Sequence, residues 1–113
     1  MIVCITARST GMAAPVEERF GRAPFFVFVD TEKGTSKSVE NPLIGAASGV
    51  GPRAVQLLAE HGATTVITGQ VGGNAARALE AGGIKAYAYH GSGSVADALA
   101  EYTAGNLQPL SLS

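Results

Sequence analysis

Two segments near the start of the chain are apolar at almost every position, which restricts the chain to folds that contain buried strands. Residues 2–7 read IVCITA and residues 25–30 read FFVFVD. A strand with one face in water alternates polar and apolar residues, whereas a strand covered on both faces carries an unbroken apolar run. Both segments are therefore predicted to be inner strands of a sheet that is covered on both faces. An α/β domain with three layers follows.

Three further segments have the length and the pattern of strands. Residues 35–41 (TSKSVEN) are polar and follow a TEKG turn, so they are predicted to form a hairpin with residues 25–30 at one edge of the sheet. Residues 64–69 (TTVITG) read as a buried strand, and residues 84–90 (IKAYAYH) as a half-covered one. Numbered along the chain, the five strands are expected in the order 3-2-1-4-5, with strands one, four and five parallel and strand three antiparallel to strand two.

Three helices are expected between and after these strands. The first lies within residues 51–62, the second starts at Asn74 as a candidate N-cap, and the third starts at Ser94. Asp97 follows Ser94 by three positions, which is the spacing of a capping box. Residues 106–113 are interpreted as a tail.

The composition limits the classes of function. The 113 residues suffice for one domain, taken as residues 1–113. With 46% hydrophobic and 15% charged residues and a net charge of -1, disorder and a general nucleic-acid-binding surface are not expected. No disulfide can form within the chain because Cys4 is its single cysteine. No segment resembles a signal peptide or membrane span, so the expected location is the cytoplasm.

In a sheet of this kind, ligands bind beyond the carboxyl ends of the parallel strands. Three glycine-containing loops are expected there: residues 8–12 (RSTGM), 69–74 (GQVGGN) and 90–94 (HGSGS). Two of them lead into helix N-termini, whose free N–H groups favour anions. Arg19 and Arg22 are expected to overhang the same edge, beside Arg8 from the first loop. The residues predict an anion site.

Simpler interpretations stay open for each part of this site. Any one of the glycines could serve a tight turn alone, and Arg22 could pair with Glu17 or Glu18. His90 lies at the expected edge, but a single histidine is not a metal site. Residues 49–54 (GVGPRA) fit a dinucleotide fingerprint, yet neither a buried strand before it nor an acidic residue at the required distance is present.

Groups that would support catalysis are not apparent. Cys4 is expected to be an inert thiol, because it lies in the middle of a buried strand. The carboxylates of the hairpin do not form a set for two-metal hydrolysis, and the serines lack an evident base.

Three stretches together resemble the dinitrogenase iron-molybdenum cofactor biosynthesis family: residues 18–30 (ERFGRAPFFVFVD), 40–42 (ENP) and 54–87 (AVQLLAEHGATTVITGQVGGNAARALEAGGIKAY). The resemblance implies a ribonuclease-H-like fold in which the second strand runs antiparallel to its neighbours. It also implies a carrier rather than an enzyme, with cofactor-assembly proteins as possible partners. One branch, the orange proteins, is associated with a mixed molybdenum-copper sulfide cluster.

The resemblance also assigns a ligand and its residues. Relatives often have histidine where this chain has Arg19 and proline where it has Gly73, and the loss of histidine favours binding by charge and hydrogen bonds. The expected cargo is an anionic molybdenum-containing sulfide cluster, possibly molybdenum-copper, bound to a protein that is folded without it. Alternatives are a module that binds a small anion, a nucleotide or a protein partner without metal, and a hydrolase. The candidate binding residues are Arg8, Arg19, Phe20, Gly21, Arg22, Gly69, Gly72, Asn74, His90 and Ser94, with no protein residue as a metal ligand.

Overall fold

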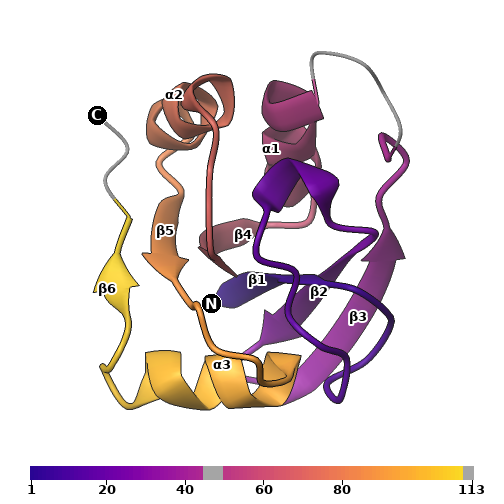
Figure 1. Cartoon of the computed structure of the whole chain (residues 1–113), viewed down its shortest axis with the longest axis vertical. Coiled ribbons are helices and arrows are strands. Elements are labelled where there is room, and N and C mark those ends of the chain that lie inside the picture. The colour runs from indigo at the N-terminus through magenta and orange to yellow at the C-terminus, as the bar shows by residue number, and fades with distance from the viewer. Residues whose placement is uncertain (45–49, 111–113) are drawn as a thin grey trace.

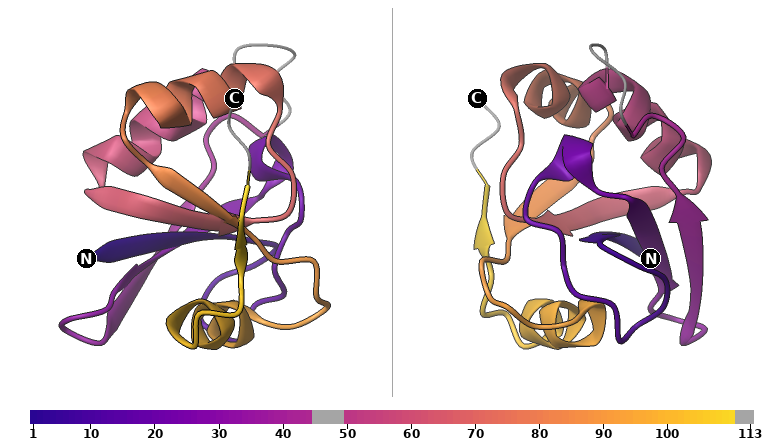
Figure 2. Two further views of the ribbon diagram at one scale, coloured as in Figure 1. Left: turned by 90° about the vertical axis from the view of Figure 1, so that its left-hand side faces the viewer. Right: turned by 45° about the vertical axis from the view of Figure 1, so that its right-hand side comes forward.

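A computed structural model describes residues 1–44 and 50–110. A mixed six-stranded sheet lies between helices on both of its faces, as Figures 1 and 2 show. The strands are β1 (Ile2–Ala7), β2 (Phe25–Asp30), β3 (Thr35–Glu40), β4 (Ala63–Thr68), β5 (Lys85–Ala88) and β6 (Gln108–Pro109). The helices are α1 (Val50–Glu60), α2 (Gly73–Ala81) and α3 (Val95–Thr103), with a short 3-10 turn, η1 (Phe20–Arg22).

The order of the strands is β3-β2-β1-β4-β5-β6. Strand β1 is antiparallel to β2 and parallel to β4. Within the sheet, Cys4 is paired with Phe28 of β2 and with Val66 of β4. Strands β4 and β5 are parallel, and β2 and β3 form the antiparallel hairpin. The predicted α/β fold class, the order of the first five strands and the antiparallel second strand are thus confirmed.

The prediction of five strands with a C-terminal tail was wrong. Strand β6 pairs antiparallel with β5, with Tyr87 opposite Pro109, and the N–H of Leu110 donates to the carbonyl of Ala86 at 2.8 Å. Leu107 and Leu110 pack against the two hydrophobic cores, which holds this segment on the sheet. Residues 111–113 and Gly49, the first glycine of the rejected dinucleotide pattern, lie outside the described residues.

The unbroken apolar runs are explained by two cores, one on each face of the sheet. On the face covered by α1 and α2, Cys4 packs with Phe26 and Leu58. On the face covered by α3, Ile5 packs with Val27 and Val95. Burying a side chain of this size contributes about 1.5–3 kcal/mol to folding. Figure 2 shows the α1–α2 layer and the α3 layer on opposite sides of the strands.

The sequence predicts the end of α1 and the start of α3 correctly, but not the start of α2. Gly62 adopts φ +76° after α1, and Ser94 and Asp97 form the predicted capping box of α3. Asn74 is not the N-cap of α2, because the backbone is already helical at Gly73 and the extended cap residue is Gly72. No described helix is both long and apolar enough to cross a membrane.

Candidate functional site

The segment before η1 continues the sheet at the predicted ligand edge. Arg19 forms a parallel bridge with Gln70, and the N–H of Phe20 donates to the carbonyl of Gln70 at 3.0 Å. The N–H groups of Gly69 and Gln70 both donate to the carbonyl of Glu18, at 2.8 and 2.7 Å. The arginine-containing segment therefore lies directly beside the loop that leads from β4 into α2.

The glycines of this loop have two different roles. A Cβ on Gly69 would lie 2.8 Å from the carbonyl oxygen of Glu18, so the absent side chain lets the two backbones meet. At Gly72 and Gly73, a Cβ would have no neighbour within 4 Å. Gly69 thus allows the loop to contact the segment that contains Glu18, whereas Gly72 and Gly73 leave open space at the start of α2.

The N-terminus of α2 has free hydrogen-bond donors. Within the described part of the chain, no acceptor is found for the backbone N–H groups of Gly73, Asn74 and Ala75, and the first bond of the helix runs from Ala76 to Gly72. Asn74 does not cap them, because its side-chain oxygen accepts a hydrogen bond from Arg77. These donors and the helix dipole favour an anion.

The N-terminus of α3 differs because its donors are already used. The N–H of Ser94 donates to the Asp97 carboxylate at 2.9 Å, and the N–H of Asp97 donates to the Ser94 hydroxyl at 3.2 Å. The N–H groups of Val95 and Ala96, which lie between Ser94 and Asp97, donate to carbonyls of the loop after β1. Ser94 therefore lies near the expected edge with its polar groups engaged in the fold.

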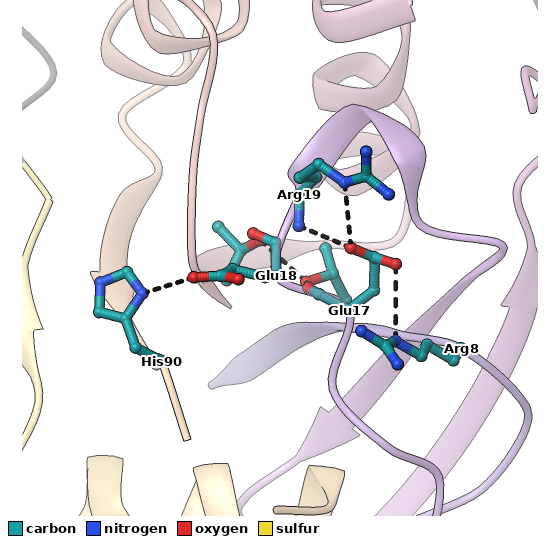
Figure 3. Close-up of polar contacts among 7 residues, drawn as sticks. Arg8, Glu17, Glu18, Arg19 and His90 are labelled. Carbon is teal, nitrogen blue, oxygen red and sulfur yellow. Dashed lines mark hydrogen bonds and ion pairs between the residues drawn. The ribbon is translucent and has the colours of Figure 1, made fainter. Parts of the chain in front are cut away.

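A buried carboxylate lies between two of the predicted arginines. Glu17 Oε1 is 3.6 Å from Arg8 Nε, and Glu17 Oε2 is 3.6 Å from Arg19 Nε and accepts the backbone N–H of Arg19 at 2.9 Å. The Glu17 side chain is 10% exposed, whereas those of Arg8 and Arg19 are 61% and 64% exposed. Figure 3 shows both arginines directed at this one carboxylate. From the sequence, Glu17 was expected only as a possible partner for Arg22.

The ion pairs leave an excess of positive charge at this edge of the sheet. Arg22, exposed on η1, makes no ion pair with any described residue, so the alternative pairing with Glu17 or Glu18 is not observed. Arg8, Arg19 and Arg22 thus carry three positive charges, against two negative charges on Glu17 and Glu18. The balance favours an anionic ligand.

His90 extends the site on the side of Glu18 away from the arginines, as Figure 3 shows. Its Nδ1 lies 3.0 Å from Glu18 Oε1, and both side chains are about half exposed. Arg8, Glu18 and His90 line a cavity of about 240 Å³. The other lining residues are Pro15, Val16, Tyr89, Gly91 and Ser92.

Groups that hold metal ions directly are scarce at this edge. Cys4 is fully buried in β1, and burial raises the pKa of its thiol well above the ordinary value. Across the described ranges 1–44 and 50–110, no three His, Cys, Asp or Glu side chains lie together as a metal-binding group. The donors at the edge are guanidinium and backbone N–H groups.

These observations define the class of protein: a three-layer α/β domain with a cationic, glycine-containing edge at the carboxyl ends of its parallel strands. Residues 1–105 match the family described as dinitrogenase iron-molybdenum cofactor, and the chain belongs to this family. The resemblance stated from the sequence is thus confirmed.

Two solved structures show the same fold over nearly the whole chain. The apo form of the orange protein from Desulfovibrio gigas has 33% identity and a TM-score of 0.92, over 97% of this chain and 92% of that chain. A Thermotoga protein of the DUF35 family, provisionally named as a NifB protein, has 36% identity and a TM-score of 0.86, over 96% and 92%. No curated protein matches the chain.

Proposed function

We propose that the chain is a non-catalytic carrier that binds an anionic molybdenum-containing metal-sulfide cluster as its cargo. The family is named for the iron-molybdenum cofactor, and the orange protein shares the fold over 97% of this chain. The observation that supports the proposal is the junction between Arg19 and Gln70, where the backbone of the arginine-containing segment lies beside the loop that leads into α2.

The chemistry of these donors suits a cluster that brings its own sulfides. Guanidinium and amide N–H groups donate hydrogen bonds to anionic sulfur, and a hydrogen bond to a charged group contributes about 1.5–3 kcal/mol. Arg19, Arg22 and the N–H groups that follow Gly72 would supply these bonds. A mixed molybdenum-copper sulfide is the form of cargo that resemblance to the orange-protein branch implies.

A carrier role fits the groups at the edge better than turnover does. Among the described residues, the Glu18–His90 pair has no metal-binding carboxylate set beside it, and no hydrogen bond joins His90 to the Ser92 hydroxyl of the same cavity. Delivery to a second protein is the expected role, and cofactor-assembly proteins in the cytoplasm are the proposed partners. The Thermotoga neighbour named for NifB supports this choice.

The test is reconstitution of purified apo protein with tetrathiomolybdate and copper, followed by gel filtration and metal analysis of the protein peak. Molybdenum is expected to comigrate with the protein in a fixed ratio. ATP and inorganic phosphate, offered separately, test the alternative anion-binding module. Retention of either of these without any retention of molybdenum would overturn the proposal.

A further inference from the structure

We infer that Glu17 is a positioning residue that holds Arg8 and Arg19 as a paired clamp for a large, weakly hydrated thioanion. This inference rests on the proposed function and assigns a role to a buried acid at a site for anions. A carboxylate would weaken such a site if charge alone mattered. The contacts of Glu17 indicate that it contributes by positioning the two arginines.

The backbone of Glu17 is hydrogen-bonded to β1, an inner strand of the sheet. Its N–H donates to the carbonyl of Thr6 at 2.9 Å, and its own carbonyl accepts from the Thr6 hydroxyl at 2.6 Å. The Thr6 hydroxyl also lies 2.9 Å from that of Thr68 in β4, and both threonines are fully buried. The carboxylate therefore starts from a rigid position between β1 and β4.

Both arginines are held by their inner nitrogens. The ion pairs join the Nε atoms of Arg8 and Arg19 to separate oxygens of Glu17, and no described residue accepts a hydrogen bond from their terminal nitrogens. The outer N–H groups of two long and otherwise flexible side chains thus stay available to a ligand. Holding them in place before binding lowers the ordering cost of binding.

The position of Glu17 also indicates which anions the clamp accepts. A small anion that enters between the two guanidinium groups approaches the Glu17 carboxylate and is repelled. A larger anion with charge on several sulfur atoms contacts the outer N–H groups at a greater distance from that carboxylate. Guanidinium is weakly hydrated, which favours large polarisable anions. We therefore expect tetrathiomolybdate to be preferred over molybdate.

The test compares the neighbouring carboxylates, because charge and positioning predict opposite signs for Glu17→Gln. Affinity for tetrathiomolybdate is measured by calorimetry in wild type, Glu17→Gln and the matched control Glu18→Gln. Each substitution removes one negative charge, but Glu18 contacts His90 and neither arginine. Glu17→Gln is expected to weaken binding about ten-fold, since two side chains lose their order. Glu18→Gln should bind equally or more tightly.

Equal tightening by both variants would show that charge alone acts and would overturn the inference. In an Arg8→Gln, Arg19→Gln background, Glu17→Gln should no longer weaken binding, and the thermal transition of each variant checks its folding. Proton exchange at the two arginine Nε–H groups of the apo protein gives a readout without ligand. It should be slow in wild type and in Glu18→Gln, and fast in Glu17→Gln.

The two proposals can fail separately. If wild type fails to bind tetrathiomolybdate, the carrier proposal fails. Equally fast exchange in wild type and Glu17→Gln contradicts the positioning role.

Discussion

Cys4 shows how its surroundings decide the chemistry of a single side chain. The thiol is fully buried in β1, and burial raises its pKa, so the reactive thiolate is scarce even at mildly alkaline pH. We predict that a thiol reagent such as DTNB reacts very slowly with the native protein and fully after unfolding in urea. A fast, stoichiometric reaction of the native protein would contradict this account.

Gly69 and Gly73 are close in sequence but differ in what surrounds them. A Cβ at position 69 would collide with Glu18, whereas one at position 73 meets open space in the first turn of α2. We predict that Gly69→Ala lowers the free energy of unfolding by about 1–3 kcal/mol. Gly73→Ala should be neutral or stabilising. Urea denaturation of both variants measures the difference, and equal stabilities would disprove the tight contact.

The sequence predicted much of the candidate site at the scale of residues, but not how its charges are arranged. Arg19 and the loop before α2 were expected at the same edge of the sheet, and the bridge between Arg19 and Gln70 shows them side by side. Glu17 was missed as the shared partner of Arg8 and Arg19. Arg8 lies nine positions earlier, and the two meet because Ala7 pairs with Val16, a tertiary contact that local patterns do not reveal.

At the scale of elements, the N-termini of α2 and α3 look alike in sequence and differ in structure. All four leading N–H groups of α3 have acceptors, whereas three at the start of α2 have none among the described residues. We predict that Ser94→Ala lowers the free energy of unfolding by about 1 kcal/mol through loss of the cap. It should leave cluster loading unchanged, as absorbance after gel filtration would show. Loss of loading in the folded variant would place Ser94 in the site after all.

The long elements could be predicted from burial patterns, and the short ones could not. Strands β1 and β2 are apolar on both faces because each core takes alternate side chains, so their sequence alone indicates their place. Strand β6 consists of Gln108 and Pro109, and it forms because these residues pair with the edge of β5. Asn74 has the residue type of a cap, but the point at which the backbone turns helical sets the cap at Gly72.

At the scale of the whole molecule, we expect the fold to be independent of a bound ligand. Both cores consist of apolar side chains, and the described residues hold no metal-binding group that ties strands together. We predict that apo protein unfolds in one cooperative thermal transition, with the same midpoint in the presence and absence of a chelator. A large drop in the midpoint on chelation would show a structural metal.

The central claim is that the cluster is held by arginine and backbone donors and not by a thiolate. It is tested most directly by the cluster absorbance retained through gel filtration after apo protein is loaded with tetrathiomolybdate and copper. Cys4→Ala should retain the cluster as wild type does. The Arg19→Ala, Arg22→Ala double variant should bind about a hundred-fold more weakly or worse, because it loses at least two charged hydrogen bonds. High salt should weaken retention by wild type. Full retention by the double arginine variant, together with loss of loading in a folded Cys4→Ala variant, would contradict the account.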